Sequence, residues 1–323
     1  MMMLKSILAA TTILAGTVVA YAEYPEQPIT LIVPWNAGGG TDAIARSFAA
    51  GLEQELGVNV SVVNRAGGAG VIGHDAMTKA QPDGYTIGLA TAELTSYWWN
   101  NTGQFTYEDL TPIALVNFDP AAFHVAADSE WQDLQQALDA INKAPANTYK
   151  LSGMGSGAAY HLAFAGLLQA KDIDPLKVTV VPSQGAAPGF QELAAGGVQI
   201  IPSSLPEGRT MVEAGRAKAL AVLGDERNPA FPDVPTVKEA IGLDYAGGTW
   251  RGIVAPAGIP DDAKAKLADA SAKVIASDEF KEFMKAQGYG IRFEDADGFG
   301  AFLAEQHKRV GEVMKALNLR QRD

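Results

Sequence analysis

The chain has 323 residues, 47% of them hydrophobic, and no cysteine, so it is long enough to form two medium-sized lobes with full hydrophobic cores. This composition excludes disorder, a collagen helix and zinc–thiolate sites. The 37 acidic side chains outnumber the 25 basic ones and give a net charge of −12. Because such a surface repels phosphate backbones, we expect no nucleic-acid partner.

The first 22 residues have the pattern of a secretory signal peptide. Lys5 precedes an apolar stretch at 7–19, and residues 20–22 supply the small side chains of a cleavage site. The apolar stretch is shorter than the roughly 20 residues that span a bilayer, and no cysteine follows it to carry a lipid anchor. We therefore predict a signal peptide at 1–22 that is cleaved before Glu23, which places the mature protein in the periplasm.

Strands and helices are predicted to alternate along the chain, separated by glycine-rich turns. Short apolar stretches predict strands at 29–33, 58–63, 85–90, 149–152, 178–181, 198–201, 217–223 and 253–255. Periodic apolar stretches predict helices at 43–56, 71–80, 131–141, 158–171, 187–195, 208–214, 261–277, 278–287 and 296–317. This alternation favours an α/β protein with mostly parallel sheets flanked by helices.

The order of these elements predicts two lobes, each a mostly parallel sheet flanked by helices. We assign residues 24–120 and 249–323 to lobe 1 and residues 121–248 to lobe 2, with a ligand cleft between the lobes. The chain then crosses from one lobe to the other twice, near 116–125 and 225–250. Two crossings permit closure about a hinge.

Two glycine loops lead from a predicted strand into a helix, and each is a candidate seat for a carboxylate. Glycines 38–40 form the first loop, and glycines 153, 155 and 157 form the second. Free backbone amides and the helix dipole favour an anion there, so two opposed loops suit a small dicarboxylate. A β-branched residue at Gly39 is expected to strain the first loop and block the anion. A tight turn alone also explains one such loop.

Other chemistries have little support in the sequence. The loop at 153–157 lacks the G-x-G-x-x-G spacing of a dinucleotide site, and Ser156 is not framed as G-x-S-x-G. The four histidines form no metal-binding pair, so we predict no cofactor, no metal and no catalytic residue. His161 either lines a ligand seat or is a half-buried helix residue.

A set of ordered motifs runs through essentially the whole mature chain. They are Tyr24-Pro25, Leu31-Ile32-Val33-Pro34-Trp35, Gly39-Gly40-Thr41-Asp42, Asn64-Arg65-Ala66-Gly67, Pro82-Asp83-Gly84-Tyr85-Thr86, Gly155-Ser156-Gly157, Gly185-Ala186-Ala187-Pro188, Pro232-Asp233-Val234-Pro235-Thr236 and Ala255-Pro256-Ala257-Gly258. Together they resemble the solute receptors of tripartite tricarboxylate transporters, the Bordetella uptake gene family. Several motifs in order are far more specific than one glycine loop.

The resemblance implies a type II-like periplasmic binding protein fold whose two lobes close on a small organic acid. The implied ligand is a di- or tricarboxylate or an aromatic carboxylate, and the implied partners are the integral membrane subunits of the transporter. The resemblance implies no enzymatic activity, and we expect a monomer. The residues implied to line the ligand are Trp35, Asn36, Gly39, Gly40, Thr41, Asp42, Thr91, Ser156, Gly157, His161, Ser183 and Ser203.

The chain departs from the usual family pattern at Asn36, at 182–185 (Pro-Ser-Gln-Gly) and at Gln199, so the ligand of a relative cannot be transferred to it. Two other classes stay open. A doubly wound enzyme acting on a small carboxylic acid would need a titratable cleft residue with a perturbed pKa, which the sequence does not obviously supply. The effector domain of a transcription regulator would carry a helix-turn-helix and no signal peptide.

Overall fold

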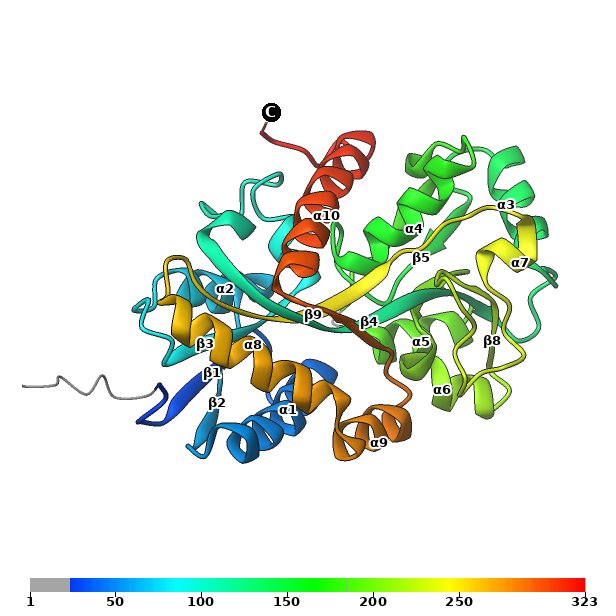
Figure 1. The fold of residues 1–323 in the computed structure, drawn as a ribbon. Coiled ribbons are helices and arrows are strands. Elements are labelled where there is room, and N and C mark those ends of the chain that lie inside the picture. Colours follow the sequence, from blue (N-terminus) through cyan, green and yellow to red (C-terminus); the bar gives the residue numbers. More distant parts are fainter. Residues whose placement is uncertain (1–23, 184, 323) are drawn as a thin grey trace, which may run out of the picture.

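The computed structural model describes residues 24–183 and 185–322. Figure 1 shows two groups of helices and strands joined by two long strands, β4 (Leu110–Ala126) and β9 (Gly248–Pro256), which run side by side across the middle of the molecule. The α/β class and the two-lobed arrangement predicted from the sequence are confirmed. The predicted signal peptide at 1–22 lies outside the described residues.

One sheet dominates the first lobe, with the strand order β10-β4-β9-β3-β1-β2. The remaining strands of this path are β1 (Ile29–Val33), β2 (Val60–Asn64), β3 (Thr86–Thr91) and β10 (Ile291–Glu294). β1 pairs with β2 and β3 in parallel, whereas β9 is antiparallel to β3 and β4, and β10 is antiparallel to β4. The sheet is therefore mixed rather than mostly parallel, because the strands that connect the lobes return in the opposite direction.

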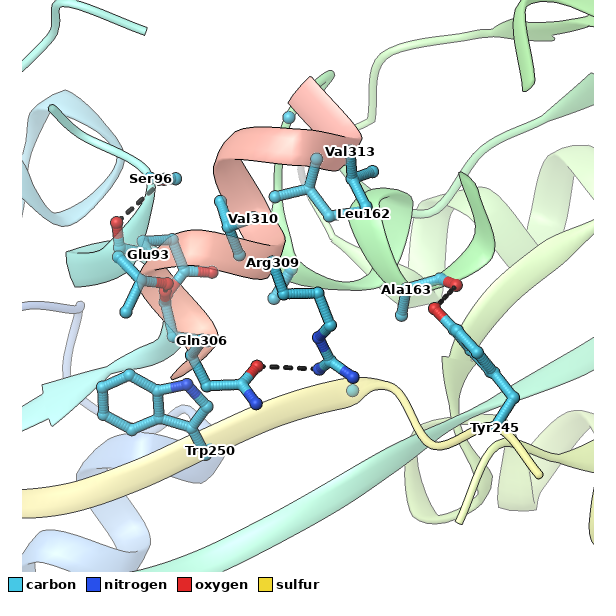
Figure 2. Close-up of a pocket in the computed structure, with 15 residues that line it drawn as sticks. Glu93, Ser96, Leu162, Ala163, Tyr245, Trp250, Gln306, Arg309, Val310 and Val313 are labelled. Atoms are coloured by element: carbon cyan, nitrogen blue, oxygen red, sulfur yellow. Dashed lines mark hydrogen bonds between the residues drawn. The ribbon is translucent and has the colours of Figure 1, made fainter. Parts of the chain in front are cut away.

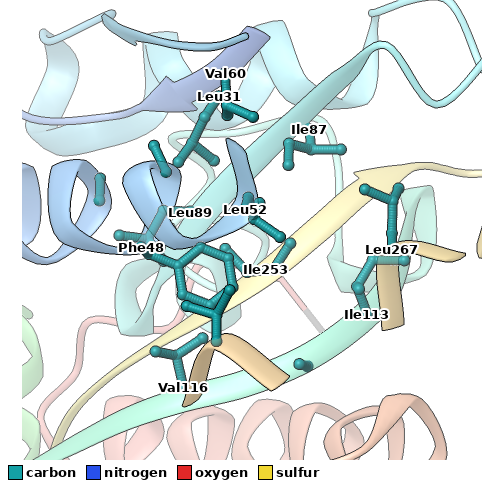
Figure 3. Packing of buried hydrophobic residues seen from close by; sticks show 14 of the residues in the cluster. Leu31, Phe48, Leu52, Val60, Ile87, Leu89, Ile113, Val116, Ile253 and Leu267 are labelled. Carbon is teal, nitrogen blue, oxygen red and sulfur yellow. The ribbon is translucent and has the colours of Figure 1, made fainter. Parts of the chain in front are cut away.

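Helices cover this sheet and bury its apolar side chains. They are α1 (Gly40–Leu56), α2 (Val71–Thr78), α8 (Asp261–Ala276), α9 (Asp278–Gln287) and α10 (Ala296–Ala316). Phe48 of α1 is fully buried and packs edge-on against Phe280 of α9, with ring centroids 5.9 Å apart. Figure 3 shows Phe48 and Leu52 facing Leu89 and Ile253 of the sheet. The burial of the apolar face of α1 fixes the position of this helix on the sheet. It thereby also fixes the first glycine loop, which leads into the helix.

The second lobe is built on the far half of β4. Residues 121–126 of β4 pair antiparallel with β7 (Ile201–Ser204) and β8 (Ala217–Val222). A separate parallel pair is formed by β5 (Tyr149–Leu151) and β6 (Val178–Val180). The helices of this part are α3 (Leu134–Lys143), α4 (Ala159–Ala170), α5 (Ala186–Ala194), α6 (Leu205–Glu213) and α7 (Val237–Ile241). Its core includes Phe123 of β4 and Phe164 of α4, which are in ring contact.

Short 3₁₀ helices complete the described elements. They are η1 (Gly68–Gly70), η2 (Ala92–Thr95), η3 (Tyr107–Asp109) and η4 (Pro175–Lys177). None of the helices within residues 24–183 and 185–322 is long and apolar enough to cross a membrane.

β4 and β9 exchange partners at one point, where the chain passes between the lobes. Pro120 of β4 faces Gly248 of β9, and beyond Pro120 the partners of β4 are β7 and β8. A Cβ on Gly248 would lie 2.3 Å from the Asp119 carbonyl oxygen, so only glycine permits this close crossing. The predicted lobe boundaries at 120 and 248 fall at this place and stay a prediction.

Replacing Phe48 by alanine should lower the free energy of unfolding by about 3–5 kcal/mol, because the variant leaves a cavity in a fully buried site. Phe293→Ala is the matched control, since Phe293 lies on β10 with 46% of its surface exposed, and it should lose less than half as much. Chemical denaturation measures both. Equal losses would contradict the assignment of the core to this face of α1.

Candidate functional site

A buried arginine on β9 connects the first glycine loop with the crossing strands. The Nε of Arg251 donates to the hydroxyl of Thr41 at 2.9 Å. Its Nη1 donates to Asp119 Oδ2 at 2.7 Å and also to Asn117 Oδ1. Burial by itself would lower the pKa of this guanidinium, but the Asp119 carboxylate beside it outweighs that effect and raises the pKa. Arg251 is therefore a permanent positive charge whose partner is already in place.

The carboxylate of Asp119 is also hydrogen-bonded on its other oxygen. Asp119 Oδ1 accepts from the backbone amide of Gly290 at 2.9 Å and from Asn117 Nδ2 at 3.1 Å. Both Asp119 and Asn117 are buried on β4. Because a buried charge is tolerated only when it is paired and hydrogen-bonded, this arrangement neutralises the pair locally.

Two side chains of the second lobe, Tyr160 and Glu207, complete a group that we call the interlobe cluster. Its members are Thr41, Asn117, Asp119, Tyr160, Glu207, Arg251 and Tyr289. Glu207 is the third residue of α6, where it forms a capping box with Ser204 and accepts from the Ser204 amide at 3.3 Å. Burial raises the pKa of the Glu207 carboxyl, although the charge of Arg251 opposes this shift. Burial, followed by the charge of Glu207, raises the pKa of Tyr160 in the first turn of α4 well above its ordinary value.

Tyr289 brings the cluster to the beginning of α1. A Cβ on Gly40 would lie 2.8 Å from the Tyr289 hydroxyl, so the phenol occupies the space beside the first helical turn. The guanidinium carbon of Arg251 lies 6.0 Å from the centre of the Tyr289 ring. The glycine at position 40 is therefore needed for this close approach.

The helix α1 begins without a side-chain cap. Its N-cap residue is Gly39, and no side chain accepts a hydrogen bond from the first turn there. Gly39 has φ −84° and ψ 171°, so a β-branched residue there would not strain the backbone, contrary to the prediction. Gly38, with φ +85°, is the residue of this loop that favours glycine. Uncapped first-turn amides are donors available to an anion.

Asp42 holds the first glycine loop in place. Its Oδ2 accepts from the Gly38 amide at 2.8 Å and from Arg46 Nε at 3.0 Å, and its Oδ1 accepts from Asn64 Nδ2 at 2.9 Å. Burial would raise the pKa of this carboxyl, but hydrogen bonds from Arg46, Gly38 and Asn64 lower it. The Asp42 carboxylate is thus committed to the loop itself.

The remaining predicted residues of the first lobe surround the same loop. Trp35 Nε1 donates to the Thr91 hydroxyl at 3.2 Å, and that hydroxyl donates to Glu93 Oε2 at 2.7 Å. Asn36 is exposed. Trp35 and Thr91 therefore connect the loop with the end of β3, and Asn36 lies on the surface of the loop.

The second glycine loop is stabilised by a neutral histidine. The backbone amide of Gly157 donates to His161 Nδ1 at 2.9 Å, and burial lowers the pKa of His161 to about 4. Ser156 is exposed at the tip of this loop. The Ser183 hydroxyl donates to the Gly185 carbonyl oxygen at 2.8 Å. Ser203 is fully buried on β7, and its hydroxyl has no partner among the described residues.

The sequence analysis missed most of the interlobe cluster. Only Thr41 was predicted, whereas Asp119, Tyr160, Glu207 and Arg251 were not. The sequence contained one indication that Arg251 is buried. It is a single charged residue between Trp250 and the apolar strand residues that follow Gly252. For Glu207 the signal was the S-x-x-E spacing from Ser204 that marks a helix start.

A small pocket lies between α4, α10 and β9 and is too small for an organic acid. Its volume is about 30 Å³, which is room for a water molecule. Figure 2 shows Arg309 of α10 reaching across it, where Nη2 donates to Gln306 Oε1 at 2.7 Å. Arg309 Nη1 also donates to the Ala246 carbonyl oxygen at 2.8 Å. This pocket is part of the packing between α10 and the segment that leads into β9.

Comparison with known proteins identifies the class of this fold and site. Residues 44–319 match the family described as "Tripartite tricarboxylate transporter family receptor". The chain is 33% identical over 297 residues to "UPF0065 protein in tcbD-tcbE intergenic region" from Pseudomonas sp. (strain P51), covering 91% of this chain and 86% of that protein.

Solved structures agree with this match. A TctC solute binding protein from Polaromonas is 33% identical, with a TM-score of 0.79 and coverage of 90% of this chain and 99% of that one. The R. palustris protein Rpa4515, solved with adipate, is 25% identical, with a TM-score of 0.78 and coverage of 92% and 99%. The chain therefore belongs to the tripartite tricarboxylate transporter receptor family, whose members are periplasmic solute-binding proteins and not enzymes.

Removing the Arg251 charge should destabilise the fold strongly. Arg251→Met leaves Asp119 buried without its partner, which is expected to lower the free energy of unfolding by about 3–5 kcal/mol. Lys79→Met breaks the exposed pair with Asp75, whose side chains are 73% and 37% exposed for Lys79 and Asp75, and should cost less than about 1 kcal/mol. Urea denaturation compares the two variants. Similar losses would show that Arg251 is not structurally important.

Stability should fall as the pH is lowered from about 6.5 toward 4. Burial lowers the pKa of His74, His124 and His161 to about 4 in the folded chain, against the ordinary value of 6.5. The unfolded chain therefore binds more protons in this interval, and the stability present above pH 6.5 is lost as the pH falls. Urea midpoints at pH 7.5, 6.0 and 5.0 measure this dependence, which should be shallower in His161→Asn. A flat profile would contradict the burial of these rings.

Proposed function

We propose that this protein is a receptor that binds a small organic acid between its lobes and delivers it to the membrane subunits of a tripartite tricarboxylate transporter. The observation that carries the proposal is the uncapped start of α1 at Gly39, which is joined to the interlobe cluster through Thr41 and Arg251. A carboxylate placed there satisfies first-turn amides that no side chain caps. A di- or tricarboxylate or an aromatic carboxylate is the class of acid proposed.

The arrangement supports backbone recognition of the carboxylate rather than a salt bridge to Arg251. That guanidinium already contacts Asp119, Asn117 and Thr41, so its role is to hold the loop in place. The dipole of the 17-residue helix α1 makes the potential at the helix start positive. The overall charge of −12 has little influence at the site because it is screened within about 8–10 Å.

We propose that the lining contains two groups of residues, one from each glycine loop and its neighbours. The members are Trp35, Asn36, Gly39, Gly40, Thr41, Asp42, Thr91, Ser156, Gly157, His161, Ser183 and Ser203. Several of them act by positioning others, as Asp42 and His161 do through their bonds to loop amides. Asn36 and Ser156 are exposed and stand free to reach a ligand.

We also propose how the molecule moves and where it works. Residues 24–120 with 249–323 form one rigid lobe and residues 121–248 the other, and they close about the crossing of β4 and β9. The change of partners of β4 at that point, from β9 to β7 and β8, supports a hinge there. Secretion through a cleaved signal peptide at 1–22 would place the receptor in the periplasm, as the family implies.

Gly39→Val tests the proposed seat. A thermal-shift screen with adipate, citrate, acetate and benzoate first identifies an acid that stabilises the protein, since ligand at 100 times its Kd adds about 2.7 kcal/mol. Valine fits the backbone at this position, where a Cβ would meet only the Asn36 carbonyl oxygen at 3.7 Å. Its side chain would cover the first-turn amides. Losing two charge-assisted hydrogen bonds should weaken binding about a hundredfold or more in calorimetric titration.

Ala50→Val is the control, because it adds the same side chain to the exposed face of the same helix. It should bind the acid as the unmodified protein does. If Gly39→Val is folded and binds as tightly as the control, the carboxylate seat is not at the start of α1.

A further inference from the structure

The end of α10 lies against the second lobe. Val313, Met314 and Leu317 form a buried cluster with Leu162 and Ala165 of α4. Figure 2 shows Val313 beside Leu162 at this contact. The first half of the same helix packs on the sheet of the first lobe. α10 therefore reaches from one lobe to the other.

The chain turns back sharply after α10 into a segment that we call the strap, residues 318–322. Asn318 has φ +54°, and the amides of Asn318 and Leu319 donate to the carbonyl oxygens of Lys315 at 3.1 Å and of Met314 at 2.8 Å. These two bonds form a Schellman motif, in which an apolar residue just after the helix packs on its last turn. Leu319 is that residue, and it packs against the cluster at the end of α10.

The strap is attached to the first lobe by two tryptophans that follow η2. The Gln321 amide donates to the Trp99 carbonyl oxygen at 2.7 Å. The guanidinium carbon of Arg320 lies 4.4 Å from the centre of the Trp99 ring, and that of Arg322 lies 4.1 Å from the centre of the Trp98 ring. One backbone hydrogen bond and two cation–π contacts thus hold the strap in place.

The strap and the last turn of α10 border the second glycine loop. A Cβ on Gly157 would lie 3.5 Å from Met314 Cε and 3.6 Å from Leu319 Cδ1, which is van der Waals distance. Gly157 has φ +80°, and its amide donates to His161 Nδ1. The end of the loop is therefore held by its own helix on one side and by the strap on the other.

We propose that the strap positions the second glycine loop relative to the first, so that the two loops can bind both ends of a dicarboxylate. This inference rests on the proposed function and deepens it, because it names the segment that sets the distance between the two carboxylate seats. A loop that is already held does not have to be ordered when the ligand binds, which favours affinity. The proposed closure would turn the second lobe about this contact as well as about the crossing of β4 and β9.

A role of Leu319 only in ending α10 makes a different prediction. Loss of the Schellman contact alone would lower the melting temperature but would leave the second glycine loop as it is. A positioning role also changes the exposure of the Gly157 amide and the affinity for acids that use both loops. The two roles are therefore separable by measurements at the loop and on the ligand.

The variants alter the strap at single contacts. Leu319→Ser removes the apolar contact with the loop, and Leu319→Met keeps an apolar side chain of similar size. Gln321→Ser is the matched control, because Gln321 is exposed and serine retains the backbone amide that bonds to Trp99. Arg320→Ser combined with Arg322→Ser detaches the strap from the tryptophans and leaves Leu319 unchanged. Thermal melting shows which variants are folded.

Hydrogen exchange of the Gly157 amide, followed by NMR without ligand, tests the first step. We expect it to be about fivefold faster or more in Leu319→Ser, which is what losing half of the burial of a leucine would give. The double arginine variant should change it in the same direction, whereas Leu319→Met and Gln321→Ser should leave it within about twofold. The Gly38 amide, which donates to Asp42 in the first glycine loop, is the internal reference and should not change.

Calorimetric titration with adipate and hexanoate tests the second step. These acids have equal length, and a methyl group replaces one carboxylate in hexanoate. Leu319→Ser should weaken adipate binding about tenfold, because the loop must then be ordered on binding, and should leave hexanoate binding within about twofold. Leu319→Met should restore the affinity for adipate, and Gln321→Ser should not alter it.

The outcomes separate the strap from the receptor function. Faster exchange at Gly157 together with a selective loss of adipate affinity supports the proposal. Unchanged exchange in Leu319→Ser, or an equal loss for both acids, overturns the positioning role and leaves the receptor function intact. If exchange is faster but neither acid and none of the screening panel stabilises the protein, the proposed function fails, and the role of the strap in ligand binding falls with it.

Discussion

The buried ion pair between Arg251 and Asp119 is the interaction on which the middle of the molecule depends. Removing two charges from water is expensive, and such a pair is tolerated when further hydrogen bonds support it. Here Arg251 reaches Thr41 and Asn117 in addition, and Asp119 accepts from the Gly290 amide. The pair thereby joins the beginning of α1, both crossing strands and the segment between α9 and β10.

The position of this pair would keep the proposed site intact during the proposed closure of the two lobes. Arg251 and Asp119 belong to β9 and β4 on the first-lobe side of the crossing, next to Pro120 and Gly248 where the strands change partners. The glycine loop before α1 is therefore fixed relative to the strands about which the lobes are proposed to turn. Tyr160 of α4 and Glu207 of α6 belong to the other predicted lobe, so the proposed closure would change their place relative to Arg251.

Local patterns predicted much of the fold, and long-range contacts account for what was missed. β1 was predicted with its observed bounds, because Ile29 to Val33 is a mostly apolar stretch rich in β-branched residues between turn residues. β4 was not predicted as a strand, because Pro112, Asn117 and Pro120 interrupt its apolar pattern and are tolerated only through its irregular pairing with β9. The glycine loops were found from local spacing. Arg251 and Asp119 were not found, because they are 132 residues apart in the sequence. Each charge is stabilised in the core only by its contact with the other, and local sequence patterns do not show that contact.

The missing cap of α1 has a consequence for how this protein balances stability against function. Serine, threonine, aspartate or asparagine at an N-cap stabilises a helix by about 1 kcal/mol relative to alanine, and glycine achieves part of that without a side chain. Gly39 has an extended backbone that any of these residues adopts, and a Cβ there meets no close neighbour. A more stable protein is thus one substitution away, yet the new side chain would occupy the donors that the proposed ligand needs. A redesign for stability alone would select this position and, if the proposed function holds, would give a more stable protein that binds its ligand less well.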